Sequence, residues 1–284
     1  MAWDICVDEL IRLDVFVELC RGALDSGVSA KEMVDLERKA LKVLRKPDPF
    51  PTEDAYKSAI AHAEKIEQFS QTEKTIGYPY LYSLGTIKIW SILESGIDDL
   101  ALEGIQAMDK CTDVELLRSL KGPLLDFYEA TDDERNEFLI TELKLSVKAS
   151  LKPGVGRFEA ILKPLGLGGE VDEKVRKVLF ELSNVRNLIV HKRSIIDKRF
   201  MSACPWIATG LGDNLCVTRE IYLNFFHAAF WYFLELDRRY RLRQGELPDH
   251  EPILNDFASR IPATIQYTTA EAQQTAAAEK PAAP

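Results

Sequence analysis

The sequence predicts an all-α protein, and three observations support this. Apolar residues recur at spacings of three and four along most of the chain, which is the period of an amphipathic helix. Patterns of the type Ser/Thr-x-x-Glu, which start helices, precede several of these stretches. No region is convincingly rich in strand patterns, and no internal repeat is present. We therefore expect a helical bundle.

Composition narrows the class of protein. The chain has 284 residues, 46% of them hydrophobic and 29% charged, which is typical of a soluble globular protein of one or two domains. The formal net charge of -9 argues against coating of a long nucleic-acid duplex, although it leaves room for a local basic cleft. The five cysteines are scattered without a C-x-x-C pair, so we expect reduced thiols and no cysteine-rich zinc site.

No targeting or membrane segment is recognisable. The N-terminus lacks the basic region followed by an apolar one that marks a signal peptide. The most apolar run, 221–234, is too short to span a bilayer. We therefore expect a cytoplasmic, soluble protein without a membrane partner.

The sequence pattern of residues 1–75 predicts an N-terminal region of three helices. The first helix covers about 3–24 and ends near a glycine. Ser29 and Glu32 form a capping-box pattern that starts the second helix, and three prolines from residue 47 onward end it. Thr52 starts a third, more polar helix, which runs to about residue 69.

We expect the main helical domain over residues 76–247. The helix expected over 80–108 is apolar on more than one side, which is typical of a central helix in a bundle. Thr112 to Glu115 and Thr131 to Glu134 are two further capping patterns, and the helix after the second is expected to reach about residue 151. A turn and a short helix over 158–162 follow.

The rest of this domain contains two longer helices. One is expected over 171–191, and an aromatic-rich helix is expected over 219–243. The stretch between them, 200–217, has little helical pattern and could carry a short hairpin. From residue 248 onward we expect a mostly disordered tail, because its last part is rich in Ala, Gln, Glu and Pro.

The polar end of the 171–191 helix is the strongest candidate for a functional site. Asn187 and His191 are four residues apart and therefore share one face of the helix. Arg186 lies about 140° round from His191, at about 100° of rotation per residue. Either a second copy of the helix or an arginine that bends round is needed to bring these groups together.

These residue types suit metal-independent cleavage of RNA. A histidine titrates near neutral pH, so it can take a proton from a ribose 2′-OH or give one to the leaving 5′-oxygen. A guanidinium can hold the phosphate and stabilise charge that grows on its oxygens. Asn187 could orient either group. The alternative is a solvated helix end whose cations interact with the helix dipole.

Local charge favours an RNA site. Residues 172–199 contain eight basic and four acidic side chains, a net charge of +4 in a chain of -9. A locally positive cleft in a protein of negative net charge is suited to binding a short stretch of RNA. The predicted RNA-binding residues are Lys192, Arg193, Lys198 and Arg199.

The segment Arg186-Asn187-Leu188-Ile189-Val190-His191 resembles the R-x4-6-H motif of the HEPN superfamily, including the polar residue directly after the arginine. The order of the surrounding helices is also similar to HEPN domains over about 78–243. A long helix with the acidic residues Glu94 and Asp98 comes before the motif, and an apolar helix closes the domain. One departure is Lys192-Arg193-Ser194, where relatives often have a glycine.

The resemblance implies an α-helical bundle that dimerises through the motif region. Many HEPN proteins are metal-independent ribonucleases of toxin–antitoxin, phage-defence or RNA-processing systems. If the roles of the family's motif apply here, Arg186 and His191 would be catalytic and Asn187 would support them. Glu94 and Asp98 would be candidates for further supporting residues. The expected partners are RNA, a second copy of the chain and an antitoxin or regulatory protein, with no cofactor and no metal.

Two other functions are considered. Some HEPN domains serve only as interaction or dimerisation modules, so a fold match does not establish activity. A metal-dependent hydrolase has little support, because the four histidines are far apart in the sequence and form no H-E-x-x-H pattern.

Overall fold

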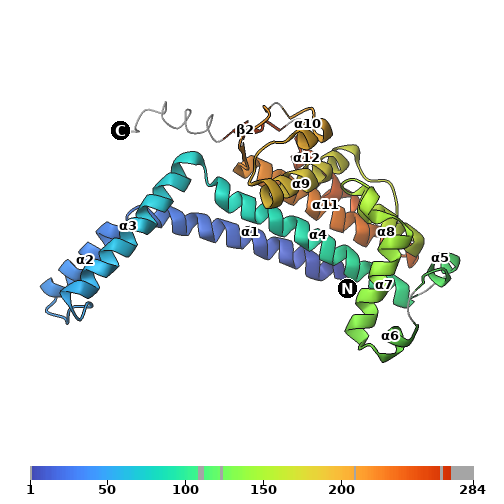
Figure 1. Cartoon of the computed structure of the whole chain (residues 1–284), viewed down its shortest axis with the longest axis horizontal. Helices are drawn as coiled ribbons and strands as arrows, with labels where there is room; N and C mark the ends of the chain where they lie inside the picture. The colour runs from blue at the N-terminus through green and yellow to red at the C-terminus, as the bar shows by residue number, and fades with distance from the viewer. Residues whose placement is uncertain (1, 108–111, 122–123, 208, 263–264, 270–284) are drawn as a thin grey trace.

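The computed structural model describes residues 2–107, 112–121, 124–207, 209–262 and 265–269. Most of these residues are helical, and the only strands among them are two of two residues each, which confirms the predicted all-α class (Figure 1). The elements in chain order are α1 (Ala2–Gly27), α2 (Ala30–Val43), α3 (Glu53–Ile76), α4 (Pro79–Ala107), α5 (Val114–Arg118), α6 (Leu124–Glu129), α7 (Asp132–Ser146), the 3-10 turn η1 (Ala149–Leu151), α8 (Gly156–Leu162), the 3-10 turn η2 (Lys163–Leu165), α9 (Glu173–Lys192), α10 (Lys198–Ala203), β1 (Leu215–Cys216), α11 (Arg219–Arg243), α12 (Glu251–Arg260) and β2 (Thr268–Thr269).

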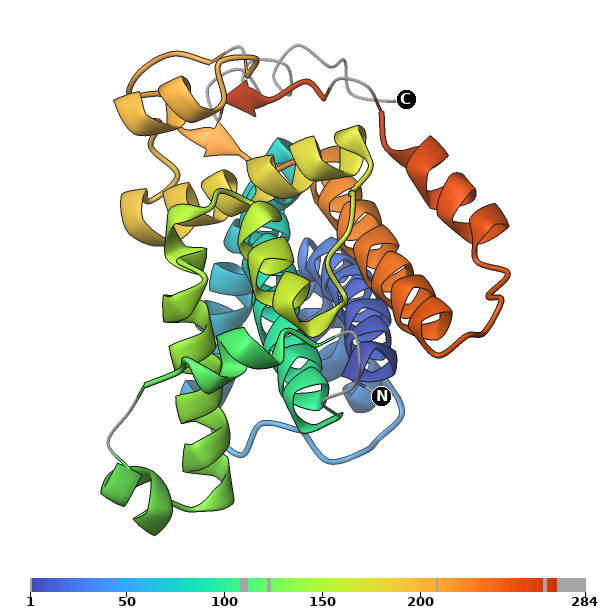
Figure 2. The same ribbon diagram turned by 90° about the vertical axis from the view of Figure 1, so that its right-hand side faces the viewer.

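Helix α4 lies at the centre of the core, as its broad apolar surface predicts. It contacts α1, α8, α9 and α11, and Figure 2 shows α1, α4 and α11 side by side with α9 lying across α4 and α11. Gly96 of α4 permits this close packing: a Cβ atom there would lie 2.4 Å from Sγ of Cys6 on α1 and 2.9 Å from the ring of Phe233 on α11. Helices from both ends of the sequence therefore share one core with α4.

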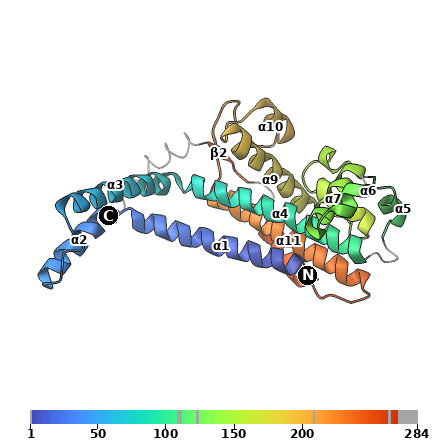
Figure 3. The same cartoon turned by 60° about the horizontal axis from the view of Figure 1, so that its bottom comes forward.

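The three N-terminal helices divide between this core and a projecting arm. Cys6, Leu10 and Val17 of α1 are buried in the main core. The α2–α3 hairpin extends from the end of α1 and α4, away from α5–α7 (Figures 1 and 3). No residue of α2 is buried. The N-terminal region therefore combines a core helix with an exposed hairpin.

Some of the predicted helix starts form and others do not. Thr131 and Glu134 make the reciprocal bonds of a capping box, and the Thr52 side chain accepts a hydrogen bond from the Ala55 N–H. The capping box predicted at Ser29 is wrong, since its side chain makes no cap hydrogen bond. Before α5 the cap is Asp113, which accepts from the Leu116 N–H, one residue later than predicted.

Helix α7 ends at Ser146, five residues before the predicted end. Lys148 has a left-handed backbone (φ 52°), and η1 follows it. A left-handed residue cannot continue an α-helix, so the chain turns here and leads through Pro153 into α8. The turn lies close against α9, since a Cβ atom at Gly154 would be 2.8 Å from Cα of Phe180.

The predictions for the C-terminal third need two corrections. The stretch 200–217 carries no hairpin of its own in its described residues: it begins inside α10, and β1 pairs antiparallel with β2. Residues 251–260 form α12, where a disordered tail was expected, because Leu254 and Phe257 pack against the core beside α11. Residues 270–284 of that tail lie outside the described residues.

A buried ion-pair network joins α8 to α11. Arg239 donates to Glu159 over 2.9 Å and to Glu235 over 2.9 Å. The Tyr232 hydroxyl donates to Glu159 over 2.7 Å, and burial raises the pKa of this phenol well above its ordinary value. Each buried charge thus has a partner, which buried charges require. Across the described part of the chain, no helix has the length and apolar content needed to cross a membrane.

Candidate functional site

Helix α9 places the Arg186–His191 motif. Asp172 caps its start by accepting hydrogen bonds from two backbone N–H groups. Its apolar residues recur every three or four positions and face the core; the buried ones are Val175, Val178, Leu179, Leu182, Val185 and Leu188. Because this stripe faces α4 and α11, the polar residues at the C-terminal end lie on the outer side.

The three motif side chains differ in exposure. Asn187 and His191 are exposed, and Arg186 is half-buried. Nη1 of Arg186 donates a hydrogen bond to Oδ1 of Asn187 over 3.2 Å. The Nε atom of Arg186 is buried and has no hydrogen-bond partner among the described residues. A guanidinium has five N–H donors, and only one bond from Nη1 is made within the described part of the chain, so the outer nitrogens keep donor capacity for a bound anion.

The chain reverses directly after His191 without a glycine. Arg193 (φ 53°) and Ser194 (φ 65°) are both left-handed, a conformation that favours glycine. The Ser194 N–H donates to the carbonyl of Leu188 over 3.1 Å, which closes the end of the helix. Asp197 then caps α10, which packs against α9. The turn after α9 is therefore made by Arg193 and Ser194, two polar residues, where a glycine is the usual choice.

Two adjoining hollows flank the motif. The first, the His191 hollow, has a volume of about 250 Å³ and is lined by His191, Lys192 and Asp197, among others. The second, the Arg186 hollow, has a volume of about 340 Å³ and is lined by Arg186, with residues of α4, α8, α10 and the turn before α8. The two share three lining residues, which are Asn184, Asn187 and Arg199.

The structure thus brings Arg186, Asn187 and His191 to one surface, but Arg186 and His191 open into different hollows. Asn187 lies at the boundary because it lines both. This agrees with the helical rotation that separates Arg186 from His191. The bond from Arg186 to Asn187 bends the arginine toward the face that carries the histidine.

The two acidic residues proposed to support the site have other partners. Glu94 forms an ion pair with Arg157 of α8 over 2.9 Å and lines the Arg186 hollow. Asp98 forms an ion pair with Lys144 of α7 over 2.7 Å and lines neither hollow. Burial raises the pKa of Asp98, and the Lys144 ammonium opposes that rise. Glu94 is therefore one of the residues that line the Arg186 hollow, whereas Asp98 is not.

The predicted RNA-binding residues are all exposed but are not equally placed. Arg199 lines both hollows, and Lys192 lines the His191 hollow with its ammonium 3.9 Å from Asp197. Arg193 and Lys198 line neither hollow. Two of the four cations therefore face the site directly.

Several lining residues were not predicted as site residues, and those with polar, charged or aromatic side chains include Lys152, Arg157, Phe180 and Asn184. Lys152 and Arg157 lie about thirty residues before the motif, and only the packing of α8 brings them near it. Asn184 and Phe180 are on α9 itself, about one and two turns before Asn187, respectively. The spacing of Asn184 and Asn187 was a usable sequence signal, since residues three apart share a helix face.

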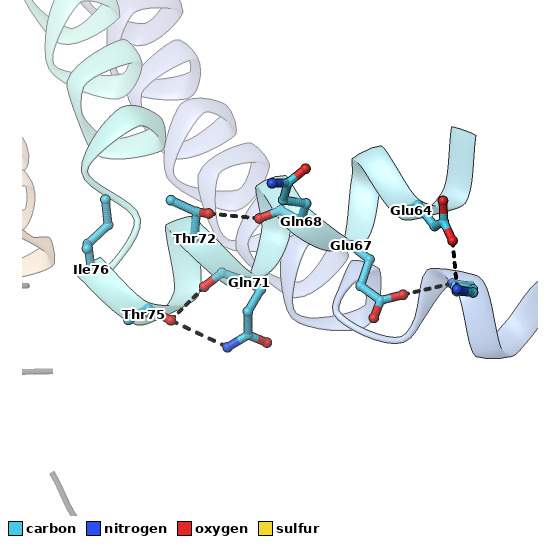
Figure 4. A pocket seen from close by; sticks show the side chains of 8 residues that line it. Glu64, Glu67, Gln68, Gln71, Thr72, Thr75 and Ile76 are labelled. Atoms are coloured by element: carbon cyan, nitrogen blue, oxygen red, sulfur yellow. Dashed lines mark hydrogen bonds and ion pairs between the residues drawn. The ribbon is translucent and has the colours of Figure 1, made fainter. Parts of the chain in front are cut away.

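Another hollow lies along α3 in the projecting arm (Figure 4). Its volume is about 560 Å³. Its polar side chains already bond one another: Lys31 donates to Glu64 over 2.6 Å, and Thr72 donates to the carbonyl of Gln68 over 2.8 Å (Figure 4). This hollow contains no histidine or arginine in its lining. The motif region is therefore the better candidate.

The described residues contain no group of three or more His, Cys, Asp or Glu side chains arranged to hold a metal ion. Comparison with family models, with curated proteins and with solved structures finds no match to this chain.

Proposed function

We propose that this protein is a metal-independent endoribonuclease of the HEPN type, with Arg186, Asn187 and His191 at its active site. The observation that supports this most directly is the position of Asn187, which lines both hollows and accepts a hydrogen bond from Arg186. A phosphodiester lying over Asn187 would have the exposed imidazole of His191 on one side and the guanidinium of Arg186 on the other.

The proposed reaction is an attack by the ribose 2′-oxygen on the adjacent phosphorus. The bond to the 5′-oxygen breaks, which gives a 2′,3′-cyclic phosphate and a 5′-hydroxyl. A proton leaves the 2′-OH and another joins the 5′-oxygen, and His191 performs one of these transfers. Arg186 stabilises the charge on the non-bridging oxygens, as a guanidinium can.

A second copy of the chain would supply the other proton transfer through its own His191. This is the reason to propose a homodimer that meets at the motif region. A role in toxin–antitoxin or phage-defence systems, with a neutralising or regulatory protein partner, is a further part of the proposal that rests on the resemblance of the motif alone.

The test is RNA cleavage in the presence of EDTA, followed by analysis of the product ends. Single-stranded RNA should be cut and should carry 2′,3′-cyclic phosphate and 5′-hydroxyl ends. RNA with a 2′-O-methyl group at every position should remain intact, because it lacks the attacking hydroxyl. Ends with a 3′-hydroxyl and a 5′-phosphate would refute this mechanism, and binding of RNA without any cleavage would favour the interaction module.

A further inference from the structure

The Arg186 hollow has a chemical composition of its own. Four cationic side chains line it, and they are Lys152, Arg157, Arg186 and Arg199. Glu94 is the one acidic residue among its lining residues, and it pairs with Arg157 over 2.9 Å. Lys152, Arg186 and Arg199 make no ion pair within the described part of the chain. The hollow therefore carries excess positive charge and favours an anion.

An aromatic side chain and an amide complete the hollow. Phe180 is half-buried, lines the hollow and packs against Trp206 with ring centroids 6.2 Å apart. Nδ2 of Asn184 donates to the carbonyl of Phe180 over 2.9 Å, which fixes the amide and turns its Oδ1 away from that bond. A bare inorganic anion needs neither group. A nucleotide can use both groups: its base can stack on the ring of Phe180, and the N–H groups of the base can donate to Oδ1 of Asn184.

The hollow also adjoins the proposed reaction centre. Asn184, Asn187 and Arg199 line it together with the His191 hollow. A ligand that occupies both hollows has to be extended. Single-stranded RNA has this form, with a phosphate between successive bases.

We propose that the Arg186 hollow is a subsite for the nucleotide next to the cleaved bond of single-stranded RNA. Lys152 and Arg199 bind the phosphate of that nucleotide, and Phe180 contacts its base. Glu94 restrains the subsite by holding Arg157 and by placing a negative charge in its wall. This inference rests on the proposed function and adds a specific substrate class and binding residues to it.

The experiment measures binding of a fluorescent 2′-O-methyl RNA hexanucleotide, which cannot be cleaved, by anisotropy at several salt concentrations. Lys152→Gln should weaken binding roughly tenfold and reduce the salt slope by about one, as expected for loss of a phosphate contact. Glu94→Gln should strengthen binding, because it removes the acidic group and releases Arg157. Lys174→Gln is the matched control: Lys174 is an exposed lysine of α9 that lines neither hollow, and its variant should bind like the wild type.

Each outcome separates this inference from the proposed function. If both Lys152→Gln and Glu94→Gln bind like the control while RNA cleavage still requires His191, the subsite is refuted and the nuclease stands. If the wild type binds no RNA, both are refuted. Displacement of the hexanucleotide by inorganic phosphate as readily as by a mononucleotide would identify a simple anion site and would also refute the nucleotide subsite.

Discussion

Arg186 donates a hydrogen bond from Nη1 to Oδ1 of Asn187, its neighbour in the chain, over 3.2 Å. Helical rotation alone would point the arginine away from the face that carries His191. The bond draws the guanidinium toward Asn187, which shares that face with the histidine. A single chain therefore turns Arg186 toward this face, although Arg186 and His191 still line different hollows.

Asn187→Ala should lower the rate of RNA cleavage by roughly 10- to 100-fold, because Arg186 loses the group that positions it. Single-turnover cleavage of a labelled RNA measures this rate. Val190→Ala is a suitable control, since Val190 is exposed on the same helix and lines neither hollow. An Asn187→Ala enzyme as fast as the Val190→Ala enzyme would show that the hydrogen bond has no part in the reaction.

Gly96→Ala should reduce the free energy of unfolding by about 2 kcal/mol, because the added methyl group overlaps Cys6 and Phe233. Gly22→Ala should raise it by up to about 1 kcal/mol, since nothing lies within 4 Å of the new Cβ and alanine favours helix. Urea unfolding measures both. Equal stabilities for the two variants would contradict the packing of α1 and α11 against α4.

Arg239→Met should destabilise the protein by roughly 3–5 kcal/mol, because it leaves the Glu159 carboxylate without its cation and removes one of the two arginines that bind Glu235. Arg12→Met removes an ion pair to Asp8 in which both side chains are largely exposed, so its effect should stay below about 1 kcal/mol. The same urea unfolding experiment compares them. A small effect at Arg239 would mean that the network contributes little to the docking of α8 on α11.

His227 should make the stability depend on pH. Burial between α11 and α12 lowers its pKa below the ordinary value of 6.5, and the nearby Arg260 adds to this effect. Because the unfolded chain then binds the proton more readily, this contribution to stability is complete above about pH 6.5 and declines as the pH falls below it. Thermal unfolding from pH 7.5 to pH 5 should show a smaller loss of stability for His227→Gln than for the wild type. The exposed His62→Gln should behave like the wild type, and identical pH profiles for all three proteins would contradict the prediction.

The sequence predicted the elements that depend on local patterns. The apolar spacing from Val175 to Leu188 identified α9 and placed Asn187 and His191 on its outer face. It did not predict α12, because this ten-residue helix is short and is held by packing against α11, with Leu254 as its buried residue. The left-handed residue Lys148, which ends the turn after α7, also has no marker such as glycine in the sequence.

The candidate site was predicted only in part for the same reason. Arg186, Asn187 and His191 belong to one short motif, so their proximity follows from a single helix. Lys152 and Arg157 reach the Arg186 hollow only through the turn before α8 and the packing of that helix on α4. Contacts between segments distant in the sequence leave no periodic pattern, and they become visible only in three dimensions.

The most direct measurement is cleavage of labelled single-stranded RNA in EDTA by the wild type, His191→Ala and His62→Ala. Both histidines are exposed on helix surfaces, so neither substitution should disturb the fold. We expect the wild type and His62→Ala to cleave alike, and His191→Ala to be slower by at least about 100-fold, the contribution of a general acid or base. Cleavage by His191→Ala at the wild-type rate, or wild-type cleavage that needs added magnesium, would contradict the proposed nuclease.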